Sequence, residues 1–429
     1  MASTSTTDPG PLGPTTRWDR IDAIDTLRGV ALLGIFVMNV PIFALTGTAF
    51  FNPPVAGGFE GLDYLTWLFS HLLFDMKMMA IFSMLFGAGV ALMADRLTKT
   101  GRSAAGVHYM RMVWLLVIGM LHAYLIWFGD ILVAYALTGM LVYPMRRVPA
   151  VWLVVISGGL LAVGMTLTGL QQAFFEMMRT STDPDMAEAW QDMGTMFFPT
   201  EAFLEEERAK NLDGFFGRAR AYMIDVVFMQ TYVFGTFIFW RVAALMLLGM
   251  ALHKWGVFRA DRSARFYATL TAIGALTGGG LVAAGVVVNH ANGFDPVAFF
   301  GVVGWFNYAG SVGMALAWIG LVMLVCKTGV LGLVRHALAS VGRMALTNYL
   351  MQSLIGAFIF YGWGLGYFGQ LSRSELLPIV LGVWTLQLII STVWLWKFRF
   401  GPMEWVWRSL TYLKPAPMLK AARAGTAAG

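Results

Sequence analysis

The feature that most constrains this chain is a series of apolar stretches, each about 20 residues long and nearly free of charge. A helix of about 20 apolar residues spans the hydrocarbon core of a bilayer, and only a helix satisfies its own backbone amides in lipid. Candidate spans lie at 27–45, 72–93, 109–128, 131–145, 149–170, 225–252, 265–288, 306–326, 344–365 and 376–396. The sequence therefore predicts an all-α polytopic membrane protein with about ten transmembrane helices.

Composition excludes the main alternatives. Only 13% of the 429 residues are charged, whereas a soluble domain carries about 25%. The net charge of +6 is typical of basic cytoplasmic loops in a membrane protein and does not indicate a nucleic-acid partner. The single cysteine, Cys326, excludes an intrachain disulfide and a CxxC metal site, and no metal is expected.

The distribution of lysine and arginine predicts how the spans are oriented. Arg96, Lys99 and Arg102 precede the third span, whereas the 46–62 and 289–305 loops contain no lysine or arginine. Basic loops remain in the cytoplasm, and the alternation holds over all short loops. Both termini are therefore predicted to be cytoplasmic.

These boundaries predict five segments. Residues 1–20 are a polar, disordered cytoplasmic tail, 21–170 a five-helix bundle, 225–412 a second five-helix bundle with an interfacial segment, and 413–429 a cytoplasmic tail. Between the bundles, 171–224 is an acidic extracytoplasmic loop with amphipathic helices, which either lie on the membrane surface or form a substrate lid. Gly274 and Gly278, spaced as GxxxG, predict close helix packing.

Charged side chains inside spans cost about 2.5–3.5 kcal/mol each, so they are candidate functional residues. Asp75 and Lys77 lie in the outer part of the second span and, two residues apart, point to different sides of a helix. Each therefore needs a partner elsewhere, and His71 shares a helix face with Asp75. We expect both residues to bind substrate, and structural ion pairs are the alternative.

His122 and Asp130 are the predicted catalytic pair. A tight turn at Gly129 and Asp130 would bring the carboxylate back to the imidazole. Histidine is suited to proton transfer near neutral pH, and a carboxylate can orient it and stabilise its cation. A hydrogen-bonded packing role is the alternative.

Further polar residues complete the candidate set. Asn39, Arg241, Asn348 and Gln352 lie within spans and are expected to bind substrate or to join helices by hydrogen bonds. Arg241 keeps its charge and needs an anion, for which Asp75 is a candidate. At the inner ends, Arg28, Arg343 and Arg408 are expected to bind either the phosphates of a cytoplasmic donor or anionic lipid headgroups.

Several segments together resemble the YeiB family of bacterial inner-membrane proteins, over about residues 21–412. They are RIDAIDTLRGVALLGIFVMNVPIF, MAIFSMLFGAGVALM, HAYLIWFGDILVAYALTG, GRMALTNYLMQSLI and FRFGPMEWVWRSLT. Through Asp25, Arg28 and Gly29, this family resembles the transmembrane acyltransferases, which include the lysosomal heparan-α-glucosaminide N-acetyltransferase. The resemblance implies a bacterial inner-membrane location and a membrane-embedded catalytic histidine, which His122 matches by depth.

The combined expectation is an acyltransferase-like protein that moves an acyl group from a cytoplasmic donor to an extracytoplasmic acceptor. Acyl-CoA would be a co-substrate, with no tightly bound cofactor. The partners would be membrane lipids, a small-molecule substrate and, because glycine-rich spans self-associate, a second copy of the chain. The alternatives are a transporter or small-molecule binder and a structural partner in the membrane.

Overall fold

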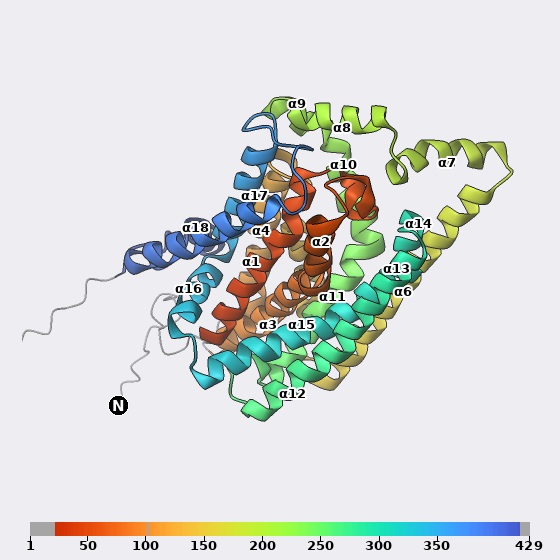
Figure 1. Cartoon of the computed structure of the whole chain (residues 1–429). Coiled ribbons are helices and arrows are strands. Elements are labelled where there is room, and N and C mark those ends of the chain that lie inside the picture. Colours follow the sequence, from red (N-terminus) through yellow and green to blue (C-terminus); the bar gives the residue numbers. More distant parts are fainter. Residues whose placement is uncertain (1–21, 100, 102, 421–429) are drawn as a thin grey trace, which may run out of the picture.

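The computed structural model describes residues 22–99, 101 and 103–420, and Figure 1 shows them as a bundle of helices. Within these ranges, helices, turns and one isolated β-bridge between Phe398 and Leu419 make up the chain. The predicted tail at 1–20 and residues 421–429 of the second predicted tail lie outside the described residues. The all-α prediction is confirmed.

Among the described residues, eight helical segments are long and apolar enough to cross a membrane. They are Asp22–Ala44 (α1), Gly61–Lys99, Ala104–Leu125 (α4), Ala150–Thr180 (α6), Met223–Lys254, Ala264–Ala291, Pro296–Thr328 and Leu376–Lys397 (α18). Four of these comprise shorter elements: α2 (Gly61–Leu73), α3 (Lys77–Lys99), α10 (Met223–Phe228), η5 (Met229–Ile238), α11 (Phe239–Lys254), α12 (Ala264–Gly274), η7 (Ala275–Gly279), α13 (Gly280–Ala291), α14 (Pro296–Phe299) and α15 (Val302–Thr328).

The other two predicted spans form shorter helices. The 131–145 segment forms α5 (Leu132–Val142), 11 residues long, followed by η4 (Tyr143–Arg147). The 344–365 segment forms α17 (Ala345–Phe360), 16 residues long. A helix rises about 1.5 Å per residue, so α5 alone is too short to cross a bilayer. The count of about ten spans is therefore not confirmed.

Glycines bring helices from the two predicted halves into backbone contact. A Cβ on Gly87 of α3 would lie 2.0 Å from the carbonyl oxygen of Met246 of α11, and one on Gly249 would lie 1.9 Å from that of Met84. A Cβ on Gly342 of α16 (Gly332–Arg343) would lie 1.9 Å from the carbonyl oxygen of Asp25 in α1. Since helices of the two halves interlock, two separate five-helix bundles are not confirmed.

The GxxxG prediction is confirmed. A Cβ on Gly274 would lie 2.6 Å from the carbonyl oxygen of Gly313, and one on Gly278 would lie 2.6 Å from that of Gly310. Both partners belong to α15, so α12 and η7 pack backbone to backbone on α15. Larger side chains would force these helices apart.

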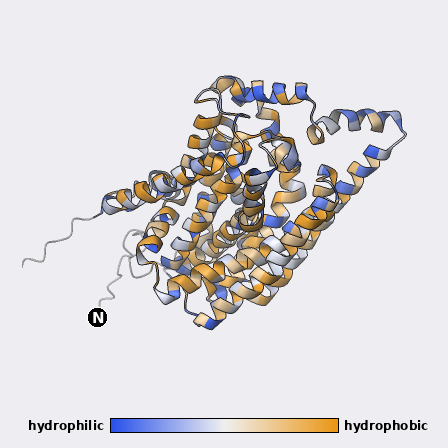
Figure 2. Ribbon diagram, viewed as in Figure 1, coloured by the Kyte–Doolittle hydropathy of each residue, from blue (hydrophilic) through white to orange (hydrophobic). Residues whose placement is uncertain are grey.

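The bundle has two ends that differ in character. We call the end of the bundle at the top of Figure 1 the upper face. It carries η2 (Gly47–Phe50), η3 (Pro53–Val55), α7 (Pro184–Phe197), α8 (Glu201–Leu212) and α9 (Phe215–Ala221). The lower face, with α16 and the start of α12, lies at the opposite end. Hydrophilic residues gather on α7 and α8, whereas apolar residues dominate the long helices (Figure 2).

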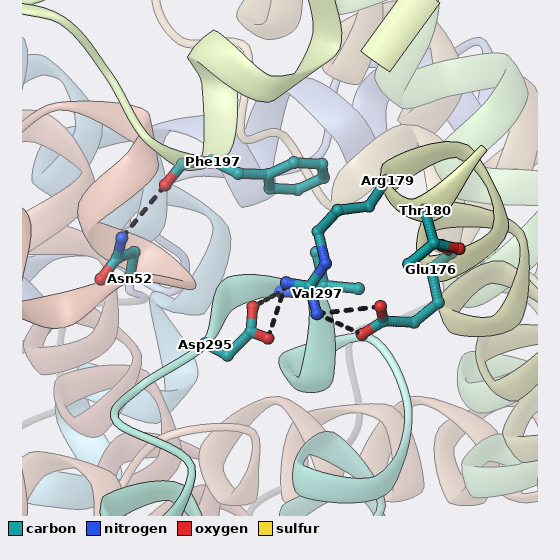
Figure 3. A network of polar contacts seen from close by, with 7 residues as sticks. All are labelled: Asn52, Glu176, Arg179, Thr180, Phe197, Asp295 and Val297. Carbon is teal, nitrogen blue, oxygen red and sulfur yellow. Dashed lines mark hydrogen bonds and ion pairs between the residues drawn. The ribbon is translucent and has the colours of Figure 1, made fainter. Parts of the chain in front are cut away.

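The predicted 171–224 loop consists mostly of helices that are tied to the upper face. Arg179, at the end of α6, pairs with Glu176 and with Asp295, both at 2.9 Å (Figure 3). Asn52 donates a hydrogen bond to the Phe197 carbonyl oxygen at 3.0 Å. The segment therefore contacts the upper-face loops at 47–52 and 295–300, whereas the corner between α6 and α7 projects beyond the bundle (Figure 1).

Candidate functional site

A cavity of about 130 Å³ lies below the upper face, between α1, α2, α13, α15 and α18. Most of its wall is apolar and includes Val37, Val40 and Val380. Its lining also includes His71, Asp75 and Asn307, which form the polar group that we call the cavity floor. Three loops that the charge pattern predicts on one side of the membrane contribute to this lining, at 46–53, 289–299 and 373–377.

A break between two helices places the ionisable part of this floor. The helix stops after Leu73 and resumes at Lys77, and Met76 between them has a left-handed φ of 60°. Non-helical backbone at membrane depth is tolerated where it lines a cavity or is buried in protein. The break turns Asp75 into the cavity while Lys77 begins the next helix.

Asp75 and Lys77 are joined through Asn307. The Asp75 Oδ2 atom accepts a hydrogen bond from Asn307 Nδ2 at 2.7 Å and lies 3.1 Å from His71 Nδ1. Lys77 is fully buried, and its Nζ donates to Asn307 Oδ1 at 2.6 Å and to the His71 carbonyl oxygen at 2.5 Å. Lys77 thereby satisfies a carbonyl near the broken end of α2. The predicted contact of His71 with Asp75 is confirmed, whereas Asn307 had no signal in the sequence beyond its place in a span.

His122 and Asp130 form a second pair, buried in the protein. The Nδ1 atom of His122 lies 2.7 Å from Asp130 Oδ1, and the two side chains are 1% and 2% exposed. Asp130 Oδ2 also accepts a hydrogen bond from the backbone nitrogen of Val133 at 2.8 Å, at the start of α5. The predicted return of Asp130 to His122 is confirmed. The Nε2 atom of His122 is buried with no hydrogen-bond partner among the described residues.

Aromatic side chains lie beside this pair, and the ring of Tyr349 is the nearest, with its centroid 5.2 Å from that of His122. The Trp127 ring packs edge-on to His122, with centroids 6.5 Å apart, and stacks on Phe43 of α1 at 4.4 Å. His122 is absent from the cavity lining, to which α1 contributes the residues just before Phe43. The predicted catalytic pair and the predicted substrate-binding residues therefore do not share this cavity, because Asp75 alone among them lines it.

Arg241 is held by polar groups other than Asp75. Its Nη1 donates to the Tyr308 carbonyl oxygen at 2.8 Å and its Nη2 to Ser311 Oγ at 2.6 Å. The guanidinium carbon lies 4.6 Å from the centre of the Tyr308 ring. Within the described ranges no carboxylate forms an ion pair with Arg241, so its predicted pairing with Asp75 is not observed.

The remaining substrate-binding candidates do not line the cavity. Asn39 is half-buried on α1. Asn348 donates to Ser391 Oγ of α18 at 2.9 Å, and Gln352 donates to Gln387 Oε1 of α18 at 2.9 Å. Asn348 and Gln352 therefore join α17 to α18, which is the structural alternative considered for them.

At the lower face, basic and aromatic residues of α1, α4 and α19 (Pro402–Tyr412) lie near one another. Arg28 pairs with Asp25 at 2.8 Å, and Arg408 stacks on Phe400 at 4.6 Å. Arg111 lies 4.3 Å from the Trp407 ring and interacts electrostatically with both Arg28 and Arg408. Arg111, within the predicted span 109–128, was not among the predicted site residues. Arg343 lies in the last turn of α16.

Glu404 of α19 caps the start of α17. Its carboxylate accepts hydrogen bonds from the backbone nitrogen of Leu346 at 2.6 Å and from Thr347 Oγ1 at 2.6 Å. Burial raises the pKa of this carboxyl, although the hydrogen bonds oppose that shift. Glu404 thus fixes the position of α19, which carries Arg408.

The rim of the cavity is fixed by two charged residues. Glu207 of α8 accepts a hydrogen bond from the backbone nitrogen of Gly47 at 2.8 Å, and burial raises its pKa. Arg373 donates to the carbonyl oxygens of Pro53, Ala56 and Gly58. Burial lowers the pKa of Arg373 to about 10, so its guanidinium remains charged at neutral pH.

Among the described residues, three buried histidines have a ring nitrogen without a hydrogen-bond partner: His108, His122 and His253. Of these, His122 is the one whose other ring nitrogen contacts a carboxylate. The cavity with its polar floor lies apart from all three. No group of three or more His, Cys, Asp or Glu side chains that could hold a metal ion occurs in the described part of the chain.

Comparisons with known proteins identify relatives along nearly the whole chain. Residues 252–414 match a family described as "Protein of unknown function (DUF418)". The chain is 31% identical to "Uncharacterized protein YeiB" of Escherichia coli (strain K12), over 94% of this chain and 98% of that protein. It is 28% identical to "Uncharacterized protein YxaH" of Bacillus subtilis (strain 168), over 95% of this chain and 98% of that protein. No solved structure matches the chain.

Proposed function

Since this chain belongs to the YeiB family, we propose that it transfers an acyl group across a bacterial inner membrane. The donor is a cytoplasmic thioester of the acyl-CoA type, and the acceptor is a hydroxyl or amine compound on the opposite side. In this proposal the lower face and both termini are cytoplasmic, as the basic loops predict. The protein acts as a homodimer.

The observation that supports this reaction is the His122–Asp130 pair. Asp130 lies at Nδ1 of the imidazole, so the Nδ1 proton is donated to the carboxylate and Nε2 keeps its lone pair. Nε2 is buried and has no hydrogen-bond partner among residues 22–99, 101 and 103–420. A histidine oriented in this way is suited to act as a general base.

The reaction is an ordinary acyl transfer. His122 Nε2 takes the proton of the acceptor, whose oxygen or nitrogen attacks the thioester carbonyl carbon. The tetrahedral intermediate then expels the thiolate as the C–S bond breaks, and the thiolate takes the proton from the imidazolium. Asp130 stabilises the imidazolium between these two steps.

The two substrates reach this pair from opposite faces. Arg28, Arg343 and Arg408, together with Arg111, bind the phosphates of the donor at the lower face. The acceptor enters through the cavity, where Asp75 and Asn307 offer hydrogen bonds. Phe43 and Trp127 turn aside to admit it to His122, while Lys77 and Arg241 supply positive charge in the interior.

A direct test uses inverted membrane vesicles that contain the full-length protein and acetyl-CoA with a labelled acetyl group. We expect labelled product with the wild type and about 10²–10⁴-fold less with His122→Ala, as for loss of a general base. His290→Ala is the matched control, because His290 lies at the upper face and bonds to Tyr64. Undiminished transfer by a folded His122→Ala protein would refute this mechanism. Absence of transfer by the wild type would refute the donor class.

A second candidate function is transport or binding of a small molecule without catalysis. The cavity with its floor of His71, Asp75 and Asn307 favours it. Buried polar groups at a break between helices are a recurrent form of substrate site in transporters. Counterflow of a labelled solute in proteoliposomes, with no covalent product, would support this candidate over acyl transfer.

A further inference from the structure

We propose that the cavity binds a neutral molecule that carries a hydroxyl group at one end and a small apolar body at the other. The hydroxyl donates a hydrogen bond to the His71–Asp75 pair, and the body lies against α1 and α18. This inference names a ligand class for the cavity. It rests on one premise of the second candidate function, namely that a small molecule binds in this cavity. It requires neither transport nor acyl transfer.

The size of the cavity limits the apolar body. The cavity holds about 130 Å³, and an apolar cavity of about 150 Å³ in a protein core takes up benzene. A chain or ring of about six carbon atoms therefore fits. A long lipid chain would have to leave the cavity.

The walls favour an apolar body. α1 contributes Val37 and Val40, and the start of α18 contributes Leu376, Leu377 and Val380. These aliphatic side chains line the cavity and offer no hydrogen bond. The polar side chains of the lining lie on α2, α13 and α15 and at the rim, so the polar group of the ligand has to point toward these elements and away from α1 and α18.

At the floor, the atoms left for a ligand are hydrogen-bond acceptors. His71 and Asn307 both contact Oδ2 of the Asp75 carboxylate, and no described residue contacts Oδ1. The side chains of His71 and Asp75 are 18% and 23% exposed, and both line the cavity. Since Nδ1 of His71 donates to Asp75, its Nε2 accepts in the neutral imidazole. A ligand must therefore supply a donor.

The charges around the cavity favour a neutral donor over an ionised one. Lys77 lies behind the floor, bound to Asn307 and the His71 carbonyl oxygen, and it balances the charge of Asp75. Arg373 at the rim, held by three backbone carbonyls, has the carboxylate of Asp63 as its counter-charge. An ammonium group would therefore add an unbalanced positive charge, and a carboxylate would meet the free oxygen of Asp75. A hydroxyl avoids both costs.

The experiment is photolabelling of the purified full-length protein with a hexanol that carries a diazirine on its chain. We expect labels on residues 37–42 and 376–380, which surround the cavity. Unlabelled 1-hexanol should suppress them, whereas hexylammonium and hexanoate at equal concentration should not. Labels on lipid-facing residues such as Leu381, 58% exposed, serve as the reference, because every probe reaches them from the micelle.

Matched variants test whether the cavity itself takes up the probe. Val380→Trp fills the cavity and should lower labelling of 37–42 about tenfold, equivalent to about 1.4 kcal/mol. Leu381→Trp, one residue along the same helix and outside the cavity, should leave it unchanged. Val40→Phe fills the cavity from the opposite wall and provides a second variant should Val380→Trp fail to fold.

Two results would overturn the proposal. One is labelling of 37–42 and 376–380 that is no stronger than at Leu381 and insensitive to both filling variants, which would show that the cavity takes up no alcohol. The other is competition by hexylammonium or hexanoate as strong as that by hexanol, which would assign the cavity to a charged ligand. Because no acyl donor is present, neither result depends on whether His122 is catalytic.

Discussion

The molecule contains two histidine–aspartate pairs that differ in their surroundings. His122 and Asp130 lie 2.7 Å apart, and both are almost fully enclosed. His71 and Asp75 lie 3.1 Å apart, and about a fifth of each side chain is exposed, toward the cavity. The first pair has a buried nitrogen without a partner, and the second has acceptor atoms that a ligand can reach.

The difference arises from the second partner of each carboxylate. Asp130 accepts a hydrogen bond from the backbone of α5, so the pair also holds the turn between α4 and α5. Asp75 is bound to Asn307 of α15 and lies at a break in a helix. The same two residue types thus fix a turn in one place and form the floor of a cavity in the other. Residue identity alone does not distinguish these roles.

Among the variants that test this difference, removal of Asp130 should cause the largest loss of unfolding free energy. Asp130→Ala leaves His122 buried without its partner and removes the hydrogen bond to Val133, so we expect a loss of about 3–5 kcal/mol in unfolding free energy. His71→Ala should cost only about 1 kcal/mol, because Asp75 keeps Asn307. Denaturant unfolding in detergent measures both, and Asp130→Asn serves as a conservative control. Equal losses would mean that the two pairs are equally structural.

Removing Asn307 should disrupt the cavity floor alone. Asn307→Leu deprives Asp75 and the buried Lys77 of a shared partner, with an expected loss of about 2–3 kcal/mol. Asn289→Leu, from the wall of the same cavity, should cost about 0.5 kcal/mol or less. The same unfolding assay applies. A loss for Asn307→Leu no larger than for Asn289→Leu would contradict the bridging role.

Chemical modification compares the accessibility of the two imidazoles. Diethyl pyrocarbonate should modify His71 about tenfold faster than His122, since modification of His122 requires local opening. Trp127→Ala should raise the rate at His122 toward that at His71, because Trp127 packs against the His122 ring. Mass spectrometry of peptides reads out both sites. Equal rates in the wild type would show that the enclosed pair is open to solvent.

A substitution at the rim of the cavity should have the smallest effect on the accessibility of the two histidines. Glu207→Gln weakens the contact with Gly47 by about 0.5 kcal/mol, which should raise the modification rate of His71 by about twofold and leave that of His122 unchanged. Glu206→Gln is the matched control, because Glu206 pairs with Lys210 on α8 itself. A change at His122 but not at His71 would contradict the assignment of Glu207 to the cavity rim.

Local features of the fold and the site could be predicted from the sequence. The His71–Asp75 contact follows from helical spacing, and the His122–Asp130 contact follows from a tight turn at Gly129. The all-α class follows from the apolar spans. Gly274 and Gly278 correctly predicted a close helix contact. Each of these predictions involves residues near one another in the chain or a property of a single helix.

Long-range partners could not be predicted in this way. Asn307 lies 230 residues beyond Lys77, and Arg241 bonds to Ser311 instead of Asp75. A polar residue in a span requires a partner, but one sequence does not specify which helix supplies it. The break at Met76 was also missed, because neither glycine nor proline, the usual signals of a helix break, occurs between His71 and Ala80.

The glycine contacts described above limit how this molecule can change shape. The backbones of α3 and α11 are in direct contact, and so are those of α1 and α16. If one helix of a pair slid along the other, its side chains would clash with the backbone carbonyl oxygens of its partner. Because α1 also packs against α3, these four helices form one closely packed frame. A ligand would then reach the cavity through displacement of the elements that line its mouth, such as α2 and the start of α18, and not through sliding of the frame helices.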